Sequence, residues 1–134
     1  MTEIERYVRD RVSINKFSLH NGILLESVER DCAVFSMEIQ PESTNDHGTL
    51  HGGAVYTLAD MATGCAACSD GRRYVTQNGS LNFVSAQTEG TVKAVAKVQH
   101  RGRTIAVVHV DVVGTSYKLL ATGEFSFFCI EYRK

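Results

Sequence analysis

The spacing of apolar residues predicts a helix and then a strand near the start of the chain. The segment Thr2-Glu-Ile-Glu5 fits the capping-box pattern, in which a hydroxyl and a carboxylate each bond a free backbone N–H. Apolar residues follow it at helical spacing, so a short N-terminal helix is expected. From Asp31 the period changes to two, which predicts a strand that ends at Pro41. The apolar row of this strand consists of Ala33, Phe35, Met37 and Ile39.

Residues 54–69 are the least strand-like part of the chain and are rich in Ala, Leu and Met. They predict one helix of about four turns that stops at Asp70-Gly71. Because this helix is apolar on most sides, other elements must cover it. Four further strands are expected, joined by turns short enough to make antiparallel neighbours in a meander. They span residues 74–84, 91–99, 104–113 and 118–132.

Together these elements predict a single α+β domain over residues 1–134. A curved antiparallel sheet of about five to six strands would wrap around one central helix, because each supplies the cover that the other needs. The segment 23–30 is either a hairpin partner of the first strand or an earlier part of it, and residues 41–48 form a polar loop. A chain of 134 residues with 43% hydrophobic residues can bury a core of this kind.

Composition excludes several classes of partner. Lys and Arg number 14 against 15 Asp and Glu, so no bulk charge draws the chain to nucleic acid or to an anionic membrane. No apolar run approaches the roughly 20 residues that span a bilayer, and residues 1–10 are charged, unlike a signal peptide. A cytoplasmic location is expected. The cysteines are interpreted as reduced core residues; they are Cys32, Cys65, Cys68 and Cys129.

The fourteen residues from His47 to Asp60 hold two histidines, three glycines and an acid. A metal site is one interpretation, but two histidines four apart face one metal only on a helix, and His47 precedes the predicted helix. A phosphate loop is excluded because neither nucleotide-binding glycine motif is present. A purely structural turn is a third interpretation, although Asp60 among apolar neighbours is costly without a partner or a task. We expect neither a metal nor a cofactor.

The fourth interpretation is half of an acyl-transfer site. A helix N-terminus offers free N–H groups, and Gly52 and Gly53 would let a carbonyl oxygen approach them, as in an oxyanion hole. Asp60 would be a base or a nucleophile. It lies about 12 Å along the helix from Gly52 at roughly 1.5 Å per residue, so the two cannot flank one carbonyl within a chain. This separation predicts a site shared between the subunits of a symmetric dimer.

Three groups of residues resemble the signature of hotdog-fold acyl-CoA thioesterases of the phenylacetyl-CoA thioesterase (PaaI-like) group. They are Asn45, the run Gly48-Thr-Leu-His-Gly-Gly53 and the run Leu58-Ala-Asp60. The resemblance extends over most of the chain. It implies a hotdog fold, homodimers with two shared active sites, commonly homotetramers, and hydrolysis of an acyl-CoA or aryl-CoA to the free acid and CoA.

The same resemblance implies roles for individual residues. Gly52 would polarise the thioester carbonyl, and Asp60 of the partner subunit would be the base or nucleophile. Asn45 would place the water or substrate, His51 would shape the site, and Thr76 would orient the water across the interface. Two departures leave the acyl preference open: the loop carries Asp46-His47, and Ser85-Ala-Gln87 lacks a proline that is frequent in the family.

Several candidate binding residues have two possible interpretations. Arg101 and Arg103 flank Gly102 in a predicted hairpin turn, and Arg72-Arg73 follows the predicted helix. These arginines would bind the CoA phosphates or remain solvated turn charges. Gly53 is a further candidate for contact with the substrate or CoA. His109, two residues before Asp111, is interpreted as a satisfied strand pair or an interface contact. At the level of function, the alternative to a thioesterase is a non-catalytic acyl-CoA-binding hotdog protein. A dehydratase or hydratase is disfavoured because those hotdog proteins use a different arrangement of His and acid.

Overall fold

The N-terminal third of the chain forms two helices and a hairpin. The computed structural model describes residues 1–131, beginning with helix α1 (Glu3–Ser13), whose N-cap Thr2 accepts a hydrogen bond from the Glu5 N–H at 3.0 Å, as predicted. The second bond of the predicted capping box does not form, because the Glu5 carboxylate accepts from Arg9 instead. A second, unpredicted helix, α2 (Lys16–His20), is capped by Asn15. Strand β1 (Leu24–Glu29) pairs antiparallel with β2 (Cys32–Glu38), so the segment before the first predicted strand is its hairpin partner.

The central helix α3 (Gly52–Cys68) starts two residues before the predicted boundary. It does so because His51 caps it, which makes both glycines helical. A short 3-10 turn, η1 (Pro41–Ser43), precedes it, and Gly71 follows it with φ of +87°. The prediction of an apolar, covered helix is confirmed. Its buried residues are Val55, Leu58, Ala59, Ala62, Thr63, Cys65, Ala66 and Ala67.

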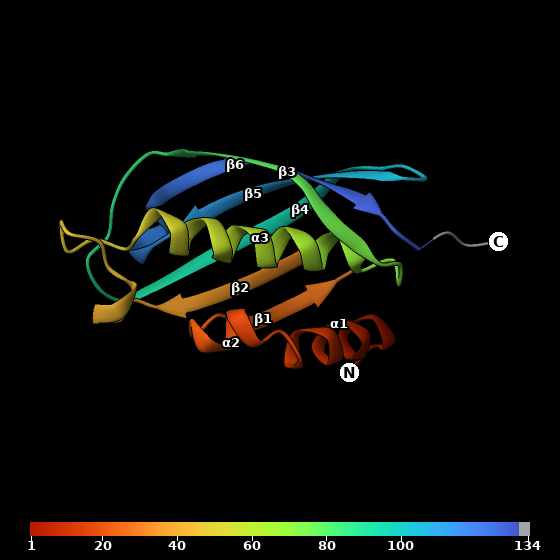
Figure 1. Cartoon of the computed structure of the whole chain (residues 1–134), viewed down its shortest axis with the longest axis horizontal. Helices are drawn as coiled ribbons and strands as arrows, with labels where there is room; N and C mark the ends of the chain where they lie inside the picture. Colours follow the sequence, from red (N-terminus) through yellow and green to blue (C-terminus); the bar gives the residue numbers. More distant parts are fainter. Residues whose placement is uncertain (132–134) are drawn as a thin grey trace.

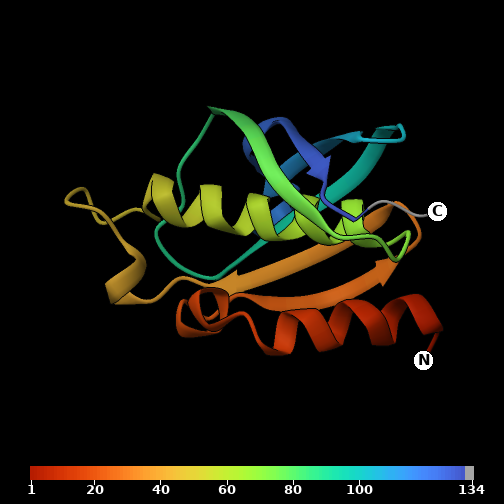
Figure 2. The ribbon, with the colours of Figure 1, turned by 45° about the vertical axis from the view of Figure 1, so that its right-hand side comes forward.

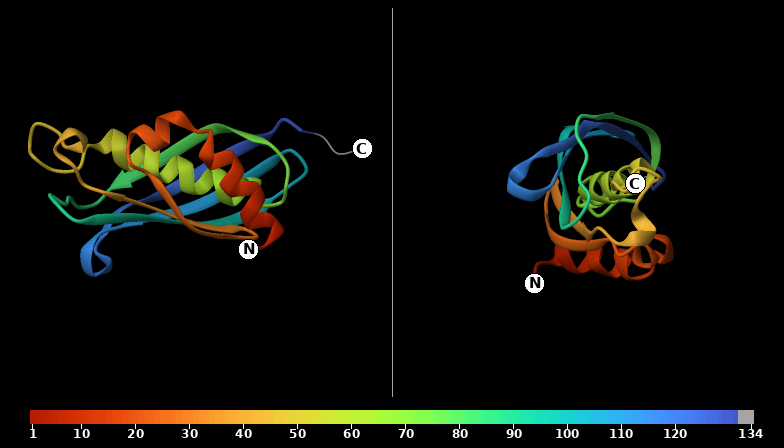
Figure 3. Two further views of the ribbon diagram at one scale, coloured as in Figure 1. Left: turned by 90° about the horizontal axis from the view of Figure 1, so that it is seen from below. Right: turned by 90° about the vertical axis from the view of Figure 1, so that its left-hand side faces the viewer.

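One antiparallel six-stranded sheet carries the rest of the chain, in the order β1-β2-β4-β5-β6-β3. Its further strands are β3 (Tyr74–Phe83), β4 (Thr91–Arg101), β5 (Ile105–Val113) and β6 (Leu119–Cys129), with a 3-10 turn, η2 (Thr115–Tyr117), between the last two. Tyr132, at the end of the last predicted strand, lies outside the described residues. Figure 1 shows α3 lying along the sheet, and the end-on view in Figure 3 shows the sheet curling around it.

The predicted four-strand meander is wrong in one place. Strands β4, β5 and β6 follow one another as expected, but β3 pairs with β6 at the far edge, and β4 pairs with β2. The connection of residues 84–90 reaches about 23 Å when extended, more than the roughly 10 Å width of a helix, so it can pass the N-terminal end of α3 instead of turning back. Strand β4 has the stronger apolar row, so it takes the interior position.

The core lies between the concave face of the sheet and α3. Three consecutive inward positions on β4 (Val92, Ala94, Ala96) and on β5 (Val108, Val110, Val112) are at most 1% exposed. The small alanines allow helix and sheet to approach closely. Helix α1 packs against β1, and α2 contacts α3; Figure 2 shows both helices below the hairpin of β1 and β2. The predicted hotdog architecture is confirmed, and no helix within residues 1–131 is long and apolar enough to cross a membrane.

Candidate active site

The first turn of α3 leaves one backbone donor unused. His51 Nδ1 accepts the Gly53 N–H at 2.7 Å, and the His51 carbonyl accepts the N–H groups of Ala54 and Val55. The Gly52 N–H donates to no acceptor within residues 1–131. Of the two glycines predicted to form an oxyanion hole, only Gly52 therefore keeps its donor available.

Asn45 lies in the same pocket as Gly52. Its Oδ1 accepts from the backbone N–H groups of His47 (2.9 Å) and Thr49 (3.1 Å), and its Nδ2 donates to Thr49 Oγ1 at 2.9 Å. These bonds fold the loop before α3, and the Leu50 N–H ties that loop to the Gln87 carbonyl of the crossover. Asn45 thus fixes the wall of the pocket into which Gly52 opens.

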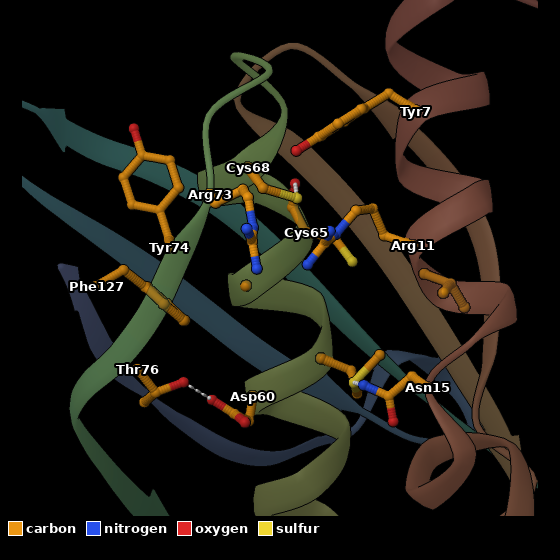
Figure 4. Close-up of a pocket in the computed structure, with 13 residues that line it drawn as sticks. Tyr7, Arg11, Asn15, Asp60, Cys65, Cys68, Arg73, Tyr74, Thr76 and Phe127 are labelled. Atoms are coloured by element: carbon orange, nitrogen blue, oxygen red, sulfur yellow. Dashed lines mark hydrogen bonds between the residues drawn. The ribbon is translucent and has the colours of Figure 1, made fainter. Parts of the chain in front are cut away.

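Asp60 sits in a different pocket, two turns further along α3. Thr76 Oγ1, on β3, donates to Asp60 Oδ1 at 2.7 Å (Figure 4). Burial raises the pKa of Asp60, and the hydrogen bond from Thr76 partly offsets that rise. No cation forms an ion pair with this carboxylate in the described part of the chain. A half-buried acid without a counterion can take up a proton near neutral pH more readily than an ordinary aspartate.

Within one chain, the residues of the candidate site therefore fall into separate groups. Asn45 and Gly52 line one pocket, whereas Asp60 and Thr76 line another. His51 and Gly53 line a third pocket, on the side of α2. The sequence-based expectation that Gly52 and Asp60 do not meet within one chain agrees with this arrangement.

The arginine predictions are only partly compatible with the structure. The Arg101 side chain is 14% exposed, and its guanidinium donates to Asp31 (2.8 Å), to the Tyr74 hydroxyl (3.0 Å) and to the carbonyls of Ala66 and Ala67 near the end of α3. Each of its three nitrogens has an acceptor inside the chain, so Arg101 is neither a solvated charge nor free to bind a phosphate. Arg103 is exposed, and its guanidinium forms no hydrogen bond or ion pair with residues 1–131.

The C-terminal end of α3 is the most highly charged packed region. Asp70, with 6% of its side chain exposed, pairs with Arg72 and Arg101 and accepts the Tyr74 hydroxyl at 2.6 Å. Burial opposes ionisation of Asp70, but the hydrogen bonds from Tyr74 and Arg72 and the charge of Arg101 outweigh it and lower its pKa. Burial and the bond to Asp70 raise the pKa of Tyr74 to about 12.

The other candidates take structural positions. Asp46 and His47 are exposed at the loop tip, 3.8 Å apart. His109 bridges Glu124 (2.9 Å) and Asp111 (3.0 Å) on the outer face of the sheet, which confirms a satisfied polar contact. All four cysteines are free and at least partly buried, as predicted. Among residues 1–131 no group of three or more His, Cys, Asp or Glu could hold a metal ion.

Sequence reasoning missed part of the Asp60 pocket. Tyr7, Arg11 and Asn15 of the N-terminal region line it. Arg73, which the sequence offered as a ligand of the CoA phosphates, lines it too, whereas Arg72 is paired with Asp70. The first three are spaced four residues apart, which places Tyr7 and Arg11 on one face of α1. That spacing was visible in the sequence, but nothing in the sequence placed this face beside the middle of α3.

Comparisons with known proteins agree with this architecture. The thioesterase superfamily model matches residues 47–119, more than half of the chain. Acyl-coenzyme A thioesterase PaaI of Escherichia coli is 31% identical over 101 residues, 75% of this chain and 72% of that protein. Human acyl-coenzyme A thioesterase 13 is 31% identical over 105 residues, 75% of each chain.

Solved structures show the same fold. A conserved protein from Pseudomonas aeruginosa superposes with a TM-score of 0.84 at 31% identity, over 87% of this chain and 95% of that one. The E. coli PaaI protein superposes with a TM-score of 0.91 at 24% identity, over 97% and 98% of the two chains. The chain therefore belongs to the thioesterase superfamily, as a PaaI-like thioester hydrolase with the hotdog fold.

Proposed function

We propose that the chain hydrolyses the thioester of an acyl-CoA or aryl-CoA to the free acid and CoA. The observation that carries the proposal is Asp60, a half-buried carboxylate that lines a pocket, has no counterion in the described chain and has a raised pKa. Ion pairing would explain a structural acid on an apolar helix, and it is missing here. The relatives named acyl-coenzyme A thioesterases support CoA as the thiol.

In the proposed mechanism, the Gly52 N–H donates to the thioester oxygen. This donor stands at a helix N-terminus, where the helix dipole also favours the negative charge that develops on the oxygen. In one route Asp60 removes a proton from water as the water attacks the carbonyl carbon, and the proton passes to the sulfur as CoA leaves as the thiol. In the other route the Asp60 carboxylate attacks that carbon itself and CoA leaves as the thiolate, which takes up a proton from solvent; water then hydrolyses the resulting anhydride to the free acid and restores Asp60. Thr76, bonded to Asp60, orients the carboxylate from the same chain.

A site of this kind has to be shared, because Gly52 and Asp60 open into different pockets. A homodimer would bring Gly52 of one subunit to Asp60 of the partner subunit and form two equivalent sites. Strand β3 supports this arrangement: it is an edge strand of ten residues that carries Thr76 and exposes Val75 and Phe83. A homotetramer and a cytoplasmic location remain predictions.

Minor roles follow from the same geometry. Asn45 would hold the loop that shapes the Gly52 pocket and help to place the water or substrate. His51 would position Gly52 by capping α3 through the Gly53 N–H. The Gly53 N–H donates to His51 and is not available to the substrate. We therefore propose that Gly53 contacts the substrate only by lying beside it with its backbone. Arg103, unlike Arg101, has a guanidinium without a partner among the described residues and would bind a CoA phosphate.

The test is a thiol-release assay over short, long and aromatic acyl-CoAs with the wild-type chain and Asp60→Asn. Hydrolysis by the wild type and its loss in Asp60→Asn, with binding of acyl-CoA retained, is the expected result. Asp10→Asn, which changes an exposed acid on α1, is the matched control. If no thioester is cleaved although acyl-CoA binds, the alternative of a non-catalytic acyl-CoA-binding protein is correct.

A further inference from the structure

The Asp60 pocket has a cationic end. Arg11 of α1 and Arg73, between α3 and β3, both line it, and Figure 4 shows their guanidinium groups directed into the pocket beside the sulfur atoms of Cys65 and Cys68. Neither guanidinium forms a hydrogen bond or an ion pair with any residue from 1 to 131. Asp60 is the only carboxylate among the described residues that line the pocket.

The charges of Arg11 and Arg73 affect the Tyr7 hydroxyl and the thiols near them, and not the Asp60 carboxylate. Burial and the charge of Glu131 raise the pKa of the Tyr7 hydroxyl, whereas both arginines lower it electrostatically, and Arg11 also acts on both thiols. Neither contributes to the environment of the Asp60 carboxylate, which burial and Thr76 determine. Two guanidinium groups that face one space repel each other, and a carboxylate bound between them relieves this repulsion.

The two ends of the pocket are joined by a stretch that is apolar on the side of α3 and β6. Cys68 lies two turns beyond Asp60 on α3, about 12 Å away at roughly 1.5 Å per residue. Met61, Gly64 and Phe127 line the intervening stretch. Gly64 has no side chain to fill this stretch, whereas a Cβ at this position would contact the Phe127 ring at 3.6 Å.

We propose that this pocket takes an acyl group whose far end carries a carboxylate, and that Arg11 and Arg73 bind that carboxylate. The substrate class is then a thioester of a dicarboxylic acid, aliphatic or aromatic. This inference rests on the proposed function, since it places the reacting carbonyl at Asp60. The phosphates of CoA have the same anionic chemistry, but the pantetheine arm carries them far beyond the length of this pocket when the sulfur lies at Asp60.

The experiment compares adipyl-CoA with hexanoyl-CoA, which have equal chain lengths and differ in the terminal carboxylate. We expect the wild type to prefer adipyl-CoA in kcat/KM by about tenfold or more, and Arg11→Gln or Arg73→Gln to reduce that preference by about tenfold. Arg9→Gln is the matched control, because Arg9 lies on the same helix and pairs with Glu5 outside the pocket. It should keep the wild-type preference.

Two further arms separate the possible failures. N-acetylcysteamine thioesters lack phosphates, and the preference of the wild type for the adipyl group should persist with them. The inference is wrong if the arginine variants lose activity equally on adipyl-CoA and hexanoyl-CoA but lose none on the two N-acetylcysteamine thioesters. In that case Arg11 and Arg73 bind a CoA phosphate. Calorimetric binding of adipyl-CoA and hexanoyl-CoA to Asp60→Asn tests carboxylate recognition without turnover. Equal binding there overturns the inference even where hydrolysis stands, whereas absence of hydrolysis with selective binding overturns only the proposed function.

Discussion

Asp60 and Asp70 are two acids ten residues apart at the middle and the end of one helix, and the chain treats them in opposite ways. Asp70 is surrounded by Arg72, Arg101 and the Tyr74 hydroxyl, and its pKa is lowered. Asp60 is buried among apolar groups with one hydroxyl donor, Thr76, and its pKa is raised. The same side chain is therefore a structural anchor at one position and, in the proposed mechanism, the reactive group at the other.

The difference shows that hydrogen-bond and ion-pair partners, and not the extent of burial, distinguish the pKa of Asp60 from that of Asp70. Burial favours the neutral acid at both positions, but only Asp70 receives compensating charge. At Asp70 the charge holds together the end of α3, β3 and the turn after β4. At Asp60 the missing charge leaves a carboxylate whose proton can be exchanged with a substrate water.

The largest expected effect is the contrast between Asp60→Asn, which should lose activity, and Asp70→Asn, which should lose stability. Asp60→Asn should lower kcat by about 10³-fold, since it removes the base or nucleophile. Asp70→Asn should leave kcat near the wild-type value and lower the free energy of unfolding by about 2 kcal/mol, because it removes a charged acceptor from Arg72 and Arg101. Thiol release and thermal unfolding measure the two quantities.

Stability should also depend on pH in opposite directions at the two acids. The raised folded-state pKa of Asp60 costs stability above the unfolded-state pKa, so Asp60→Asn should raise Tm by a few degrees at pH 7 and by less as the pH falls. The lowered pKa of Asp70 contributes stability above the unfolded-state pKa that is lost as the pH falls through the folded value.

For the activity of the same variants, a wild-type rate in Asp60→Asn would contradict the role of Asp60.

The next effect concerns the free N–H at the start of α3. Gly52→Pro removes this donor and should lower kcat by about 10²-fold, the usual cost of one oxyanion donor. Proline is well tolerated at the first helical position, and His51, with ψ of 136°, has the extended conformation that a following proline requires. Gly52→Ala is the matched control, because it keeps the N–H and places its Cβ at 3.6 Å from Phe83. Equal losses in both variants would refute the donor role.

The smallest effect is expected at Thr76. Thr76→Val removes the hydrogen bond that lowers the pKa of Asp60, so that pKa should rise further. Because the ionised carboxylate is the active form, the acid limb of kcat/KM against pH should move to higher pH, with a loss of a few-fold at neutral pH. Thr76→Ser keeps a hydroxyl and should restore the wild-type profile. An unchanged acid limb in Thr76→Val would show that Thr76 does not act through Asp60.

Local patterns predicted most of the elements, and the exceptions have physical causes. The Thr2 cap of α1, the alternation along β2 and the apolar character of α3 depend on short stretches of chain, and the structure confirms them. The place of β3 at the sheet edge depends on which strand packs best against β2, a competition between distant segments. For the same reason, the turn arginines looked alike in the sequence, although Arg101 reaches Asp31, seventy residues away in the chain.

The candidate site shows the same limit. The motif from Asn45 to Asp60 and the helical rise sufficed to separate Gly52 from Asp60. The sequence offered Arg73 as a phosphate ligand, but its place beside Arg11 was hidden, because it arises where α1 meets the segment after α3. Whether two chains complete each other's sites is a question that mixed assemblies answer.

The decisive measurement is the activity of a mixed dimer made from Asp60→Asn and Gly52→Pro chains. The two variants are co-expressed with different affinity tags, and the species that carries both tags is purified. If each site takes Gly52 from one subunit and Asp60 from the other, one of the two sites is intact, and activity per dimer should return to about half of the wild-type value. Activity no higher than that of either variant alone would contradict a shared site.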